Sequence, residues 1–131
     1  MPLARVVASV THALDPWFMG IAPAFAIPKA LRRGLTPDRI DVWEIHEAYA
    51  SVPVAILKEL PSQLDGLQVP DERLNPNGGA VAIGHPFGSS GSRYVLTLAT
   101  ELQQRQARYG VLGVCVGSGQ GVALVLENPE A

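Results

Sequence analysis

The hydrophobic residues of this chain follow two alternating periods, and this alternation constrains the fold more than any other feature. Short β-branched runs, typical of buried strands, occupy 5–10, 40–45, 111–116 and 122–126. Helical spacing occupies 23–33, 47–60 and a stripe from 95 to 102. The order β-α-β-α-loop-α-β-β predicts an α/β fold: a mostly parallel sheet covered by helices and ending in an antiparallel edge strand.

Proline and glycine mark the limits of these segments. Pro23 stands where helix starts favour proline, and Gly34 ends that helix. Pro53 lies past the first turn of 47–60, where its missing N–H and ring clash cost about 3 kcal/mol, so we expect a kink or a second helix start there. The glycine-rich run 117–121 is short enough for a hairpin between the last two strands.

The composition is that of one compact soluble domain. The chain has 131 residues, 47% hydrophobic and 17% charged, with a net charge of -2. This charge provides no basic field for nucleic acid or an anionic membrane, and no apolar run approaches the roughly 20 residues of a membrane span. We therefore expect neither partner and no export signal. The single cysteine, Cys115, excludes an internal disulfide and suits a reducing compartment, so we expect a cytoplasmic protein.

The stretch 74–91 is dense in glycine, asparagine and proline, yet it contains an apolar segment at 80–83. We therefore expect a packed loop that holds a site rather than a solvated linker. Inside it, Gly84 and Pro86 flank His85 and restrict the backbone, so the loop can present one imidazole rigidly. His85 can then act as a general base or polarise a carbonyl oxygen; a histidine that only caps a turn is the alternative.

Two further residues with reactive side chains stand at expected strand ends. Cys115 precedes the glycine-rich run 117–119, whose backbone N–H groups can form an oxyanion hole beside the thiol. Free cysteine also packs as a small hydrophobe, and this alternative stays open. His46 follows the second strand, where open α/β sheets form sites, or it contacts a helix terminus.

Two other kinds of site are weakly supported. His46, His85 and Cys115 include zinc-ligand types but lack the short paired spacings of metal sites, so we expect no metal. The turn 88–91 opens a helix and can contact an anion through backbone N–H groups, but it lacks the lysine of a nucleotide P-loop.

Three strings in the chain together resemble the C-terminal domain of thiolases: HEAYA at 46–50, NPNGGAVAIGHPFGSSG at 75–91 and CVGSGQG at 115–121. The resemblance covers about 5–127, with MGIAP at 19–23 and GLTPDRID at 34–41 in the family order. It implies one thiolase-like C-terminal domain over 1–131, an α/β fold with a mixed, mostly parallel five-stranded sheet covered by helices. Thiolases carry their acylated cysteine on an N-terminal domain, which we expect on another chain or missing.

The resemblance implies acyl transfer to and from coenzyme A, either by cleavage of 3-ketoacyl-CoA or by Claisen condensation of acyl-CoAs. His85 matches the histidine that activates the acyl-accepting cysteine and donates to the thioester oxygen. Cys115 matches the acid/base cysteine that moves the α-proton, and Gly117 would provide an oxyanion-hole N–H. His46 stands where many thiolases have an asparagine that holds a water; its imidazole either holds the water or donates directly.

The same resemblance suggests Met19 and Phe87 as substrate contacts and a role in fatty-acid metabolism such as β-oxidation. It implies no cofactor besides the coenzyme A thioester substrate, and a homo- or hetero-oligomer. We expect the chain to be inactive without an N-terminal half. A non-catalytic CoA-binding or assembly module, or a truncated gene product, is the alternative.

Overall fold

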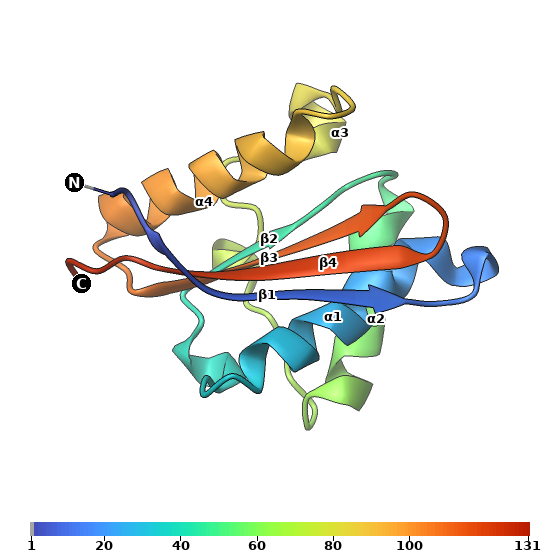
Figure 1. Cartoon of the computed structure of the whole chain (residues 1–131), viewed down its shortest axis with the longest axis horizontal. Helices are drawn as coiled ribbons and strands as arrows, with labels where there is room; N and C mark the ends of the chain where they lie inside the picture. Colours follow the sequence, from blue (N-terminus) through green and yellow to red (C-terminus); the bar gives the residue numbers. More distant parts are fainter. Residues whose placement is uncertain (1) are drawn as a thin grey trace.

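The computed structural model describes residues 2–131, and these form a four-stranded sheet with helices on both faces (Figure 1). The strand order is β1-β4-β3-β2. The strands are β1 (Arg5–Ala13), β2 (Val42–Ile45), β3 (Tyr109–Val116) and β4 (Gln120–Glu127). β2 and β3 pair in parallel, whereas β4 is antiparallel to both β3 and β1.

The expectation of a mostly parallel, five-stranded sheet is therefore wrong. The tight turn after β3 returns the chain at once as β4, and β1 pairs with β4 rather than with another parallel strand. Beside the outer edge of β2, Leu74 forms a single parallel bridge with Trp43, so within residues 2–131 this edge carries one residue pair in place of a fifth strand. The α/β class and the terminal hairpin agree with the sequence pattern.

The helices form two layers, which Figure 1 shows on opposite sides of the sheet. α1 (Ala22–Leu31) and α2 (Ser51–Gln63) cover one face, whereas α4 (Ser90–Arg105) lies across the other, preceded by the short α3 (Ala80–Ile83). Short 3-10 turns occupy η1 (Pro16–Ile21), η2 (Pro37–Arg39) and η3 (Asp71–Arg73). Within residues 2–131, no helix combines the length and the apolar character that a membrane span requires.

The start of α2 differs from the expected helix at 47–60. The helix begins at Ser51, so Pro53 lies in its first turn, where a backbone N–H has no intrahelical acceptor. The preceding residues form a turn instead, with the N–H of Val52 bonded to the carbonyl of Tyr49 at 3.0 Å. This turn connects β2 directly to α2 and leaves His46 at the end of the strand.

Apolar side chains pack on both faces because successive strand residues point to opposite sides. Val111 faces the layer of α1 and α2, whereas Leu112 faces α4. The first core contains Ile27, Ile45, Ile56, Leu60 and Val125; the second contains Val42, Tyr94, Leu98, Leu102 and Leu126.

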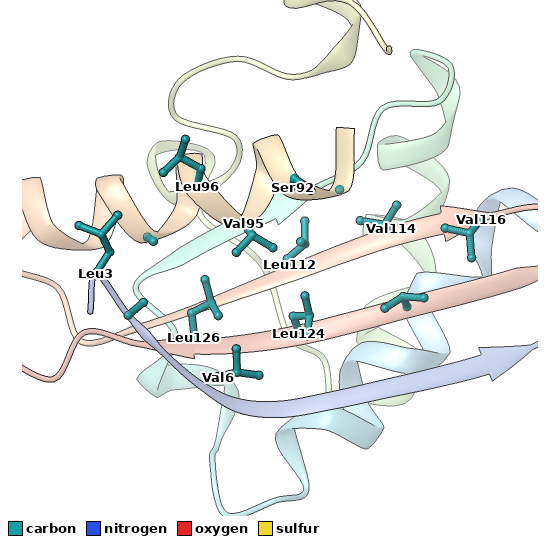
Figure 2. Close-up of a pocket in the computed structure, with 14 residues that line it drawn as sticks. Leu3, Val6, Ser92, Val95, Leu96, Leu112, Val114, Val116, Leu124 and Leu126 are labelled. Atoms are coloured by element: carbon teal, nitrogen blue, oxygen red, sulfur yellow. The ribbon is translucent and has the colours of Figure 1, made fainter. Parts of the chain in front are cut away.

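α4 covers only part of its face of the sheet. Beside it runs an apolar groove of about 670 Å³, which we call the α4 groove (Figure 2). Its walls come from α4, from the three strands β1, β3 and β4, and from the residues before β1. They include Leu3, Val6, Val95, Leu96, Leu112, Val114, Val116, Leu124 and Leu126. Val6 is 59% exposed and Leu96 56% exposed, so this face presents a continuous apolar surface to solvent.

Candidate active site

His46 follows directly after β2 and is 1% exposed. Its backbone N–H donates to the Gly113 carbonyl at 2.8 Å, which continues the parallel ladder and places His46 beside the carboxyl-terminal end of β3. Its Nδ1 lies 2.9 Å from the Tyr94 hydroxyl. Burial lowers the pKa of His46 to about 4; the charges of His85 and Arg93 act in the same direction, whereas Glu47 opposes them. His46 is therefore a neutral imidazole at pH 7.

His85 lies in the loop between α3 and α4 and faces His46. The two ring centroids are 4.4 Å apart, with the planes tilted by 55°. Nδ1 of His85 lies 2.7 Å from the Ser90 Oγ, which also donates to the Pro86 carbonyl at 3.1 Å. With its one hydrogen directed to Pro86, Ser90 accepts from the imidazole, so the proton is on Nδ1 and Nε2 keeps a lone pair. This is the form that a general base requires.

The loop that carries His85 is bonded to β2 through Asn75. The amide of Asn75 accepts from the Ile45 N–H at 2.7 Å and donates to the Ile45 carbonyl at 2.9 Å. Arg93 at the start of α4 donates to the Gly84 carbonyl at 2.8 Å, immediately before His85. Hydrogen bonds thus join the backbone segments that carry the two histidines, which favours a preorganised site.

Cys115 is near the end of β3 and is half-buried. It packs against the apolar core that includes α1, whereas His46 contacts Tyr94 of α4. Burial raises the pKa of the Cys115 thiol, so the group is protonated at neutral pH. A protonated thiol can donate a proton but is a poor nucleophile. The burial also agrees with the alternative of a packed hydrophobe, so the catalytic role remains a prediction.

The other expected residues are Gly117, Met19 and Phe87, and of these Phe87 contacts His85. Gly117 lies in the turn of the β3-β4 hairpin with a φ of 57°, a left-handed conformation that glycine adopts without strain. The Gly119 carbonyl accepts from the Leu14 N–H, which links this hairpin to the segment before η1. Met19 lies within η1. Phe87 is 88% exposed, with its ring 4.8 Å from that of His85. Their roles stay predictions.

Four residues that contribute to this arrangement were not identified from the sequence: Glu47, Asn75, Arg93 and Tyr94. Glu47 and Asn75 lie inside the strings that carried the resemblance, but no local pattern indicates their partners. Tyr94 stands one helical turn before Leu98 on the buried stripe of α4. A phenol on a buried stripe needs a hydrogen-bond partner, and this was the available signal. Within residues 2–131, no three His, Cys, Asp or Glu side chains are grouped as metal ligands.

Comparisons with known proteins bear on the family of the chain. The family model described as "Thiolase, C-terminal domain" matches residues 1–128. The beta-ketoadipyl-CoA thiolase of Acinetobacter baylyi is 45% identical over 126 residues, which cover 95% of this chain and 30% of that protein.

Solved structures show the same likeness. The acetyl-CoA acetyltransferase of Bacillus anthracis matches with a TM-score of 0.88 and 40% identity, over 97% of this chain and 31% of that one. The human mitochondrial 3-ketoacyl-CoA thiolase in complex with CoA matches with a TM-score of 0.86 and 39% identity, over 98% and 31% of the two chains. The present chain thus spans about a third of the length of these relatives. It belongs to the thiolase family, and what it contains is the C-terminal domain.

Proposed function

We propose that this chain is the C-terminal half of a thiolase-type acyltransferase, which moves acyl groups to and from coenzyme A. The reaction is cleavage of a 3-ketoacyl-CoA or the reverse Claisen condensation. The observation that carries the proposal is the pair of imidazoles of His46 and His85, whose ring centroids are 4.4 Å apart. A neutral N–H donor beside a base is the arrangement that stabilises a thioester oxyanion and activates a thiol.

Each group then has a role that suits its surroundings. His85 activates the acyl-accepting cysteine of the N-terminal half and donates to the thioester oxygen. His46 donates to the oxyanion, directly or through a water. Cys115 moves the α-proton, for which a thiol that is protonated at rest is suited in the direction of carbanion protonation. The Gly117 N–H stabilises the second oxyanion, and Met19 and Phe87 contact the acyl-CoA.

The partner in this proposal is an N-terminal thiolase half, and the α4 groove is where it docks. Two observations support this assignment. Relatives of this chain are about three times as long. The groove also exposes large apolar side chains, the kind that interfaces between domains bury. We further propose a cytoplasmic location and a role in lipid metabolism. A non-catalytic CoA-binding or assembly module would use the same groove without turnover.

Complementation tests the function. The chain is mixed with a separately purified N-terminal thiolase half, and consumption of acetoacetyl-CoA in the presence of CoA is followed. We expect turnover from the mixture and none from either half. His85→Ala should lower kcat by about 10²-fold or more, the usual effect of a lost base or oxyanion donor.

His12→Ala is the matched control, because His12 lies on β1, at the opposite edge of the sheet from β2, and contacts Lys29 and Phe25 of α1. Stable association without turnover would favour the assembly module instead. A covalent acetyl adduct on Cys115 of the chain alone, with turnover, would show that the roles of the two cysteines are misassigned.

A further inference from the structure

We propose that Tyr94 is a positioning residue, which holds His46 as a neutral imidazole with its proton on Nε2, so that this nitrogen donates into the site. The tautomer follows from the chain alone, whereas its use in catalysis rests on the proposed function.

Tyr94 reaches His46 from the first turns of α4. Its side chain is 2% exposed, and its hydroxyl lies 2.9 Å from Nδ1 of His46. The two rings meet edge to face, with centroids 5.4 Å apart. A buried phenol has one hydrogen to donate and accepts through its oxygen lone pairs, so the direction of this bond depends on its other neighbours.

Those neighbours are donors. Burial raises the pKa of Tyr94, whereas the nearby Arg93 side chain and Glu47 backbone N–H favour the phenolate and so act against it. The Arg93 guanidinium also lies over the Tyr94 ring, 5.2 Å from its centroid. Neither an amide N–H nor a guanidinium accepts a hydrogen bond. Neither group can therefore take the phenolic hydrogen, and within residues 2–131 the hydroxyl has one hydrogen-bond partner, Nδ1 of His46, so the hydrogen is directed to that nitrogen.

An imidazole whose Nδ1 accepts a hydrogen bond carries its proton on Nε2 when it is neutral. The surroundings of His46 keep it neutral: the ring is buried, and His85 and Arg93 lie close to it. Glu47, the carboxylate that raises the pKa of His46, is already bonded to the Val81 N–H at 3.0 Å and the Asn75 amide at 3.3 Å. A cationic His46 would instead donate from Nδ1 to the Tyr94 oxygen, and within residues 2–131 the phenolic hydrogen would then have no acceptor.

The tautomer is tested by long-range ¹H–¹⁵N NMR correlations of the histidine rings in the full chain. Wild type should show a neutral His46 at pH 7 with the proton on Nε2 and no titration between pH 6 and 8. Tyr94→Phe should give a mixture of both tautomers. Tyr109→Phe is the matched control, because that hydroxyl bonds to Glu127 at the other end of β3 and its loss should leave His46 unchanged.

Kinetics of the reconstituted enzyme test the consequence. Tyr94→Phe should lower kcat about tenfold, less than the 10²- to 10³-fold typical of a lost oxyanion donor, because part of the population keeps the active tautomer. KM should stay within about twofold, since the change leaves substrate contacts in place.

The outcomes separate the two proposals. A wild-type His46 with its proton on Nδ1, a cationic His46 at pH 7, or a His46 unchanged in Tyr94→Phe would each overturn the positioning role. An inactive wild-type mixture with the expected NMR result would contradict the proposed function alone. A shifted tautomer with unchanged kcat would overturn the catalytic consequence.

Discussion

The carboxylate of Glu47 lies directly against the α-carbon of Gly79, where a β-carbon would collide with it. This close approach lets Glu47 accept a hydrogen bond from the Val81 N–H at 3.0 Å, at the start of α3. Glu47 also follows His46, and α3 leads into the loop of His85. The contact therefore joins the two segments that carry the histidines.

Gly79→Ala should push the Glu47 carboxylate, the far end of a flexible side chain, off the Val81 N–H. We expect a loss of about 1–3 kcal/mol in the free energy of unfolding, the usual cost of overpacking, and a lower kcat in the complemented enzyme. Urea unfolding and turnover measure the two effects. In a Glu47→Ala background the same glycine change should cost less stability, because its collision partner is gone. Additive costs would show that the contact is not the cause.

Glu44 should make the stability of the chain fall as pH rises. Its carboxyl is buried and, among residues 2–131, has no hydrogen-bond partner. Burial raises the pKa of Glu44 from its ordinary 4.5 to about 8; the charges of Glu101 and Glu47 add to this, whereas Arg93 opposes it. The folded state therefore holds a proton that the unfolded state releases. Its contribution is complete below about pH 4.5 and is lost as pH rises to about 8.

Glu44→Gln keeps the shape of this side chain and removes its titration. Because one pKa unit corresponds to about 1.4 kcal/mol, the variant should reduce the loss of unfolding free energy between pH 5 and pH 9 by a few kcal/mol. Denaturant titrations at both pH values provide the comparison, with the exposed Glu72→Gln as control. Equal pH dependence in wild type and Glu44→Gln would contradict a proton held at Glu44.

Cys115→Ala should distinguish a catalytic role of Cys115 from a packing role. As the acid/base, Cys115→Ala should leave acylation of the partner's cysteine measurable while abolishing α-proton exchange of acetyl-CoA into heavy water. As packing alone, it should lower the melting temperature and leave exchange intact in the folded fraction. Because burial raises the pKa of this thiol, its alkylation rate should still be rising at pH 9.

A charged side chain in the α4 groove should weaken the binding of the N-terminal half. Val6→Glu places a carboxylate at a groove position that is 59% exposed, so we expect little change in the stability of the chain and at least tenfold weaker binding of the N-terminal half. Titration calorimetry measures the affinity. Val54→Glu on α2, at a 52% exposed position outside the groove, is the matched control. Equal binding by both variants would place the interface elsewhere.

Local patterns of residues were enough to predict much of the architecture. Hydrophobic periodicity located four strands and the main helices, and the glycine-rich turn after Cys115 identified the hairpin, because these features depend on neighbours close in sequence. Membership of the thiolase family, inferred from the strings around His46, His85 and Cys115, is confirmed by the family model.

Long-range contacts decided the rest. A strand's periodicity reports which of its faces is buried but not which strand lies beside it, so the pairing of β1 with β4 could not be predicted from local residues. The Tyr94–His46 bond and the burial of Glu44 likewise depend on α4 crossing the end of β2. The sequence alone thus named the reactive side chains, whereas tertiary packing decided their protonation, because desolvation and hydrogen-bond partners act through space.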